Sequence, residues 1–139
     1  MFDQHGEFNL HPIRQVLVVE LIGAFNELVA ESIIAKMETS IDTFKGQPFG
    51  ILILAQKFEL GIPESDEIFK YSEIYCQSKG LTHSALVYKL NAQVFQIGSN
   101  IITHPEMTRF FTKTLNEALS FLNESGYDIS TEEHGKCGY

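Results

Sequence analysis

Three lysines have the spacing that best suggests a binding role in this sequence. Lys57, Lys89 and Lys113 each stand at or just after the end of an apolar, strand-like segment. Residues suited to begin helices are Asn26, Ser65, Asn91 and Thr114. The ends of these strands and the starts of the helices that follow them should lie at one edge of a sheet. Helix N-termini carry partial positive charge and free N–H groups, so that edge would attract an anionic ligand or an acidic partner segment. The alternative is that the lysines are simply solvated.

A single carboxylate interrupts the apolar segment 16–22. Glu20 lies among valines, leucines and an isoleucine, where burial of a charge is costly unless it is paired. One interpretation is a general base with a shifted pKa. The other, which we favour, is a residue at a sheet edge or one paired with a cation such as Arg14.

The histidines and cysteines give no sign of a catalytic or metal site. The five histidines do not have metal-site spacing, and the group Glu132, Glu133, His134 and Cys137 would have to order a polar tail to bind a metal. Cys76 falls on the inner side of a predicted helix, and we expect a buried, unreactive thiol. Gly61 and Gly98 match no phosphate-binding loop. We therefore expect no enzyme, no cofactor and no metal.

Several phenylalanines lie near strand ends or on the last predicted strand. They are Phe25, Phe58, Phe110 and Phe111. They could line an apolar pocket or a homodimer face. Packing in the core is the simpler interpretation, and it is favoured.

Composition and charge exclude several classes of partner. The chain has 139 residues and a formal net charge of −8, which argues against non-specific nucleic-acid binding and against docking on anionic lipid. No signal peptide begins the sequence, and no apolar run approaches the roughly 20 residues of a membrane span. Both cysteines read as free thiols of a reducing compartment, so the cytoplasm is the expected location.

Hydrophobic periodicity predicts strand, strand, helix, strand, helix, strand, helix, strand, helix. The predicted strands are 7–10, 16–22, 49–55, 84–90 and 107–112, with a turn at His11 and Pro12. Such alternation is typical of an α/β fold with right-handed crossovers. We expect a mixed sheet of about five strands, the first antiparallel, with about four crossover helices.

The segment 49–55 is the expected centre of this sheet. It is apolar throughout, which is typical of a strand covered by helices on both faces. The Ile53→Ala substitution is therefore expected to cost about 2–5 kcal/mol of unfolding free energy.

Periodicity ends at Gly126. The sequence predicts one domain over residues 1–126 and a mobile tail over 127–139. Removal of the residues after Tyr127 is expected to leave thermal stability almost unchanged.

This layout resembles the SpoIIAA-like superfamily, which includes STAS domains and related STAS/CRAL-TRIO-type bacterial proteins. The resemblance covers about residues 6–126 and rests on the opening hairpin and on segments 16–23, 51–54 and 115–122. It implies a non-enzymatic regulator. Anti-sigma-factor antagonists of this superfamily bind a partner kinase and are switched by phosphorylation of a serine that begins the helix after the central strand.

The switch motif of that family is absent from this sequence. The central strand ends Leu54-Ala55-Gln56 without an Asp-x-Ser, and the next helix begins Pro63-Glu64-Ser65-Asp66 without a Ser-Ser-Gly. Only Ser65 is near the equivalent position, between two carboxylates that would repel a phosphate. The resemblance thus implies a regulatory or protein-interaction module without the usual phospho-switch, with a protein partner or a homodimer. The alternative is a carrier of a small apolar or anionic metabolite or lipid.

Overall fold

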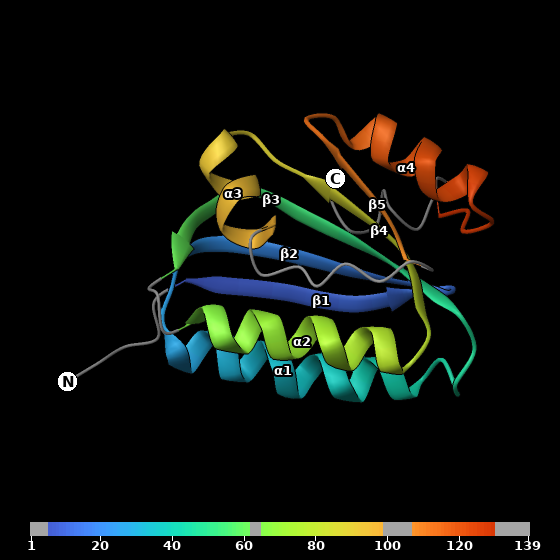
Figure 1. The fold of residues 1–139 in the computed structure, drawn as a ribbon, viewed down its shortest axis with the longest axis horizontal. Helices are drawn as coiled ribbons and strands as arrows, with labels where there is room; N and C mark the ends of the chain where they lie inside the picture. Colours follow the sequence, from blue (N-terminus) through green and yellow to red (C-terminus); the bar gives the residue numbers. More distant parts are fainter. Residues whose placement is uncertain (1–5, 62–64, 99–106, 130–139) are drawn as a thin grey trace.

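Five strands form one mixed sheet in the computed structural model, which describes residues 6–61, 65–98 and 107–129 (Figure 1). Their order across the sheet follows the chain, and β1 is antiparallel to β2 while every other neighbouring pair is parallel. The strands are β1 (Glu7–Ile13), β2 (Val16–Phe25), β3 (Phe49–Gly61), β4 (Leu81–Val87) and β5 (Thr108–Thr112). The α/β fold with an antiparallel first strand is confirmed.

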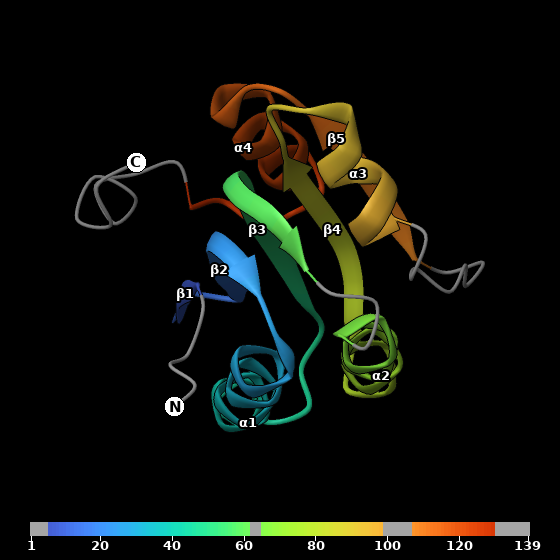
Figure 2. The same cartoon turned by 90° about the vertical axis from the view of Figure 1, so that its left-hand side faces the viewer.

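Four helices connect or follow the parallel strands, namely α1 (Glu27–Asp42), α2 (Ser65–Ser78), α3 (Asn91–Gly98) and α4 (Leu115–Glu124). Helices α1 and α2 cover one face of the sheet, and α4 covers the other (Figure 2). Two predicted N-caps are confirmed, because Asn26 Oδ1 accepts from Val29 N at 3.1 Å and Thr114 Oγ1 accepts from Glu117 N at 3.2 Å.

The first turn falls later than predicted. Strand β1 continues through His11 and Pro12 to Ile13, and the chain turns at Arg14, whose φ is 54°. Proline is tolerated there because β1 is an edge strand and one side of its backbone needs no ladder partner. Strand β3 likewise continues past Gln56 to Gly61, while β4 ends at Val87.

Each face of the sheet has its own core. The larger one lies under α1 and α2, and its fully or almost fully buried members include Leu17, Phe49 and Leu86. The smaller one lies under α4 and includes Leu52 and Leu122. Ile53 is only partly buried, so the expectation that every residue of the central segment is covered on both faces is wrong at this position.

The domain extends beyond the predicted boundary at Gly126. Ile129 is 1% exposed and belongs to the core under α4. The Tyr127 hydroxyl lies 2.6 Å from Thr82 Oγ1, and Arg14 Nη1 donates to the carbonyl of Asp128 at 3.0 Å. Residues 127–129 therefore pack on the sheet rather than belong to a tail. The predicted turn at residues 104–106 and the rest of the predicted tail, residues 130–139, lie outside the described residues.

Candidate functional site

The candidate site is a depression at the carboxyl edge of the parallel strands, which we call the rim depression. Figure 2 looks onto this edge. Lys57 from β3 and Lys89 from the turn after β4 line the same depression, and both are exposed. Its other lining residues are Ile22, Gln56, Phe58, Glu59, Leu90, Ala92 and Gln93. Two lysines that are 32 positions apart thus line one depression, although Lys57 lies inside β3, four residues before its end, and not just after a strand as predicted.

A buried amide holds the rim depression together. Gln93 Oε1 accepts from the backbone N–H groups of Lys89 and Leu90 at 2.7 and 2.9 Å. Its Nε2 donates to the carbonyls of Gln56 and Phe58 at 3.2 and 2.8 Å. This amide therefore ties the extended end of β3 to the start of α3.

Sequence reasoning missed Gln93 and assigned the cap to Asn91, which is the first residue of α3. Gln93 is the third residue of that helix, the position from which a Gln or Glu of a capping box reaches back to the N-cap N–H. The position of Gln93 in the helix could therefore have predicted its contact with the start of α3. Nothing in the sequence could have predicted its contacts with β3.

Glu20 is paired at the same edge. Its Oε1 accepts from Asn9 Nδ2 at 3.0 Å, and its Oε2 lies 3.9 Å from Lys57 Nζ. The cation suggested by the sequence, Arg14, donates to Asp128 at the opposite end of β2. Glu20 therefore has the paired role that the sequence analysis favoured.

Two other predicted residues lie at or near this edge. The Lys113 ammonium lies over the Tyr88 ring, 5.7 Å from its centroid, and Lys113 is not among the lining residues of the rim depression. Ser65 is the first residue of α2, and its side chain is outside the described part of the structure. The structure brings Lys57 and Lys89 together, and convergence of all three lysines stays a prediction.

The two phenylalanines of the predicted site pack in the core. Phe25 and Phe58 are buried, and their rings meet edge to face with centroids 5.3 Å apart. Their aromatic surface is used in packing below the rim depression, as the sequence analysis favoured.

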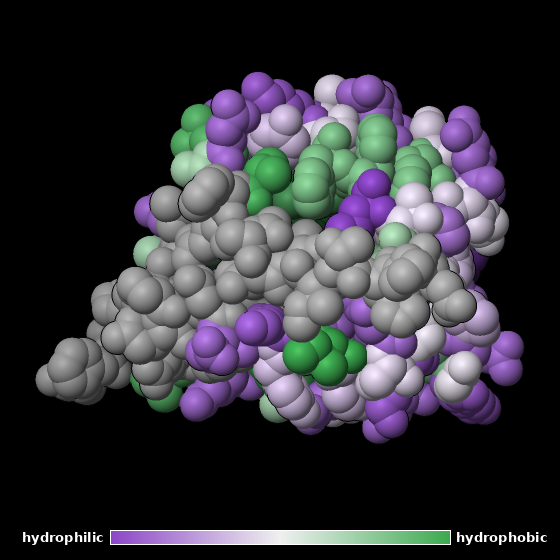
Figure 3. Space-filling model, in the orientation of Figure 1, coloured by the Kyte–Doolittle hydropathy of each residue, from purple (hydrophilic) through white to green (hydrophobic). Residues whose placement is uncertain are grey.

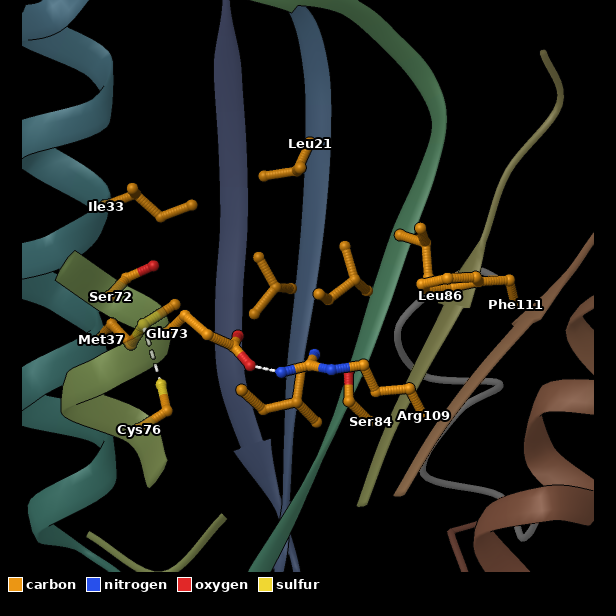
Figure 4. Close-up of a pocket in the computed structure, with 13 residues that line it drawn as sticks. Leu21, Ile33, Met37, Ser72, Glu73, Cys76, Ser84, Leu86, Arg109 and Phe111 are labelled. Atoms are coloured by element: carbon orange, nitrogen blue, oxygen red, sulfur yellow. Dashed lines mark hydrogen bonds and ion pairs between the residues drawn. The ribbon is translucent and has the colours of Figure 1, made fainter. Parts of the chain in front are cut away.

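A second hollow lies on the sheet face covered by α1 and α2 (Figure 4). It is a cavity of about 70 Å³ with mainly apolar walls that include Ile53, Leu86 and Phe111. Cys76 also lines it, and its Sγ lies 3.5 Å from Met37 Sδ. Burial raises the pKa of the Cys76 thiol to about 12, so this thiol has no nucleophilic role near neutral pH.

An ion pair crosses this cavity. Arg109 reaches from β5 across the sheet to Glu73 on α2 (Figure 4), and both side chains are mostly buried. Burial lowers the pKa of Arg109 to about 10, which still leaves the guanidinium charged near neutral pH. Sequence reasoning missed this pair because its members are 36 positions apart and no motif joins them.

The described residues show neither a metal cluster nor a membrane span. Within residues 6–61, 65–98 and 107–129, no three His, Cys, Asp or Glu side chains are grouped so as to hold a metal ion. No helix in the same part of the chain is long and apolar enough to cross a membrane.

Comparisons with known proteins identify the fold. No protein-family model matches the sequence, and no curated protein matches it. An uncharacterized protein with a SpoIIAA-like fold from Shewanella loihica aligns with a TM-score of 0.64 and 13% identity over 88% of this chain and 97% of that one. The unphosphorylated anti-sigma factor antagonist SpoIIAA aligns with a TM-score of 0.59 and 18% identity over 84% of this chain and 98% of that one.

A third similar structure is an anti-sigma factor antagonist from Mycobacterium paratuberculosis. It aligns with a TM-score of 0.57 and 13% identity over 85% of this chain and 94% of that one. Each alignment includes nearly the whole length of the known structure, so the likeness extends over the entire domain. The five-stranded mixed sheet and its helices therefore have the SpoIIAA-like fold of the STAS type.

Proposed function

We propose that this chain is a non-enzymatic, STAS-type regulatory module that acts in the cytoplasm and binds an acidic segment of a protein partner at the rim depression. The observation that carries the proposal is the meeting of Lys57 and Lys89 in one depression of a chain whose net charge is −8. The similarity to structures of anti-sigma factor antagonists supports a regulatory role.

The rim depression offers both charge and apolar surface. The Lys57 side chain is 70% exposed, and Leu90 beside Lys89 is 59% exposed. A partner segment with carboxylates and one apolar side chain would match this surface. The Glu20 side chain is only 15% exposed, so we expect Lys57 to stay beside Glu20 and to offer its remaining exposed N–H groups to a partner carboxylate.

Gln93 fixes the backbone around the rim depression before a partner binds. Its four hydrogen bonds fix the backbone on both sides of the depression. A surface that is already held in place loses less conformational entropy when a partner binds. We propose that this binding needs no phosphorylation, because the flanking Asp-x-Ser and Ser-Ser-Gly patterns are absent around Ser65.

The carrier function has less support. Ligand pockets of proteins usually measure roughly 300–1,000 Å³, and the cavity beside Arg109 measures about 70 Å³. The rim depression is open to solvent and would not enclose an apolar ligand.

The test is capture of the partner from the source cells by the full chain. The variant Lys57→Glu/Lys89→Glu is compared with Lys36→Glu/Lys70→Glu, which makes the same charge change at exposed positions of α1 and α2. We expect the control to retain a protein that wild type captures, and the rim variant to lose it. Capture should also weaken as salt increases, because the contact is between exposed charges.

A photo-crosslinking residue at position 90 locates the contact. It should label the captured protein, whereas the same residue at Ile74, an exposed apolar position on α2, should not. Equal capture by wild type and by the rim variant, with circular dichroism showing that both are folded, would contradict the proposal.

A further inference from the structure

The two edges of the sheet differ in how they are protected. Strand β1 carries Pro12 together with polar Glu7, Asn9 and His11. Strand β5 is only five residues long and reads Thr-Arg-Phe-Phe-Thr, and its one charged side chain, Arg109, is turned inward to Glu73. Proline and lysine, which also protect natural edge strands from pairing with other strands, are absent from it. In the described part of the chain, no strand pairs with the outer side of β5.

The surface around β5 is also apolar. Phe111 is 41% exposed, and Phe110 stacks on Phe121 of α4 with ring centroids 5.0 Å apart. Figure 3 shows hydrophobic side chains gathered over β5 and α4 on one face of the molecule. Pairing of this edge with another strand would cover part of that surface.

The ladder with β4 shows which backbone groups of β5 point outward. Tyr88 N donates to the carbonyl of Thr112 at 3.0 Å, so the backbone groups of Thr112 face β4. Successive residues of a strand direct their N–H and C=O groups to opposite sides. Arg109 and Phe111 therefore present two donors and two acceptors to the outer edge.

This strand is complementary to a second copy of itself. Antiparallel pairing about Phe110 sets Arg109 opposite Phe111 of the second copy, and both have outward backbone groups that exchange hydrogen bonds. Thr108 meets Thr112, and Phe110 meets its own copy at a pair where side chains approach closely. Because Glu73 neutralises Arg109 inside each copy, no unpaired like charges meet across the axis.

We propose that β5 pairs with β5 of a second copy of this chain, antiparallel and with the two-fold axis at Phe110. The sheets of the two copies then form one continuous ten-stranded sheet. Strand β5 contributes five residues, whereas stable interfaces use roughly 20–30 residues a side, so we expect a weak dimer. Its dissociation constant is expected between about 1 µM and 1 mM. This proposal does not depend on the rim depression.

Sedimentation equilibrium of the full chain tests dimer formation, from about 10 µM to about 1 mM. Wild type should become dimeric as its concentration rises. Phe111→Lys places a charge on the edge strand and should stay monomeric at every concentration. The control Leu90→Lys makes the same change at another exposed apolar position and should dimerise like wild type. Thermal melts show whether each variant is folded.

Two outcomes overturn the proposal. If wild type stays monomeric at the highest concentration, β5 does not pair with a second copy, and a strand of another protein becomes the favoured partner of this edge. Equal loss of the dimer in Leu90→Lys would place the interface elsewhere.

Disulfide trapping tests the register. In a Cys137→Ser background, Phe110→Cys places two thiols at a pair whose Cα atoms lie about 4.5 Å apart, a distance that a disulfide spans. Oxidation should yield a covalent dimer. Thr108→Cys is the matched control, since its thiol faces Thr112 of the second copy and should stay free. Equal trapping of both variants, or trapping of the control alone, would overturn the two-fold axis at Phe110.

Discussion

The two faces of the sheet are packed in different ways. Under α4 the core consists of small and apolar side chains, and Ala85, Val87 and Leu122 are fully buried. Residues 127–129 pack against one end of this core. Under α1 and α2 the core is larger, yet it leaves a cavity of about 70 Å³ and encloses the ion pair of Arg109 with Glu73.

This difference shows that the two sides of one strand can be buried to different extents. Strand β3 contributes Leu52 and Leu54 to the face under α4, where both are buried. Ile53, between them, faces the cavity and is partly exposed. The closely packed face should therefore be more sensitive to truncation of a side chain than the face with the cavity.

The largest expected effect is the loss of a side chain under α4. Leu122 is 0% exposed, so Leu122→Ala should lower the unfolding free energy by about 2–5 kcal/mol. Ile53→Ala removes a side chain that already borders a cavity and should cost only about 1–2 kcal/mol. Urea denaturation of both variants measures the difference. A cost for Ile53→Ala equal to that for Leu122→Ala would remove the distinction between the faces.

Two truncations measure how much residues 127–129 contribute to the stability of the core under α4. Ending the chain after Gly126 removes the buried Ile129 and the Tyr127 hydroxyl contact, and should cost about 2–4 kcal/mol. Ending it after Ile129 keeps both contacts and should change stability by less than about 0.5 kcal/mol. Thermal denaturation of the two chains compares them. Equal melting temperatures would show that residues 127–129 do not stabilise the domain.

The ion pair on the other face should show a smaller and non-additive effect. Arg109→Met alone leaves Glu73 mostly buried without its cation, and should cost about 1–3 kcal/mol, less than for a fully buried pair. The double variant Arg109→Met/Glu73→Leu removes both charges and should recover most of this loss. A double-mutant cycle in urea measures the coupling. Additive costs would mean that the two side chains do not interact.

The smallest expected effect is a pH dependence at the start of α4. Hydrogen bonds from the Thr114 and Thr112 hydroxyls hold the pKa of Glu117 below its usual 4.5. Because the folded pKa is the lower one, the stabilisation is present above pH 4.5 and is lost as pH falls through the folded pKa. The melting-temperature difference between wild type and Glu117→Gln should therefore shrink in acid. Glu124→Gln, in the last turn of the same helix, is the control.

Local signals in the sequence determined much of the fold. The caps at Asn26 and Thr114 and the order of strands and helices were predicted, because a cap is a contact between residues three apart and periodicity is read within one element. The neighbourhood of Lys57 and Lys89 followed from a rule of topology, since the carboxyl ends of neighbouring parallel strands share one edge of the sheet.

Other features were decided by contacts between distant segments. Tyr127 and Ile129 stand among polar residues and looked like the start of a tail, yet Ile129 fits a site that β-strands and α4 build together. Arg109 meets Glu73, and Gln93 meets the end of β3, only after the sheet has formed. Sequence patterns report which residues are apolar and how they repeat. Which side chain fills a given space depends on the shape left by elements far away in the chain, and that shape exists only in the tertiary structure.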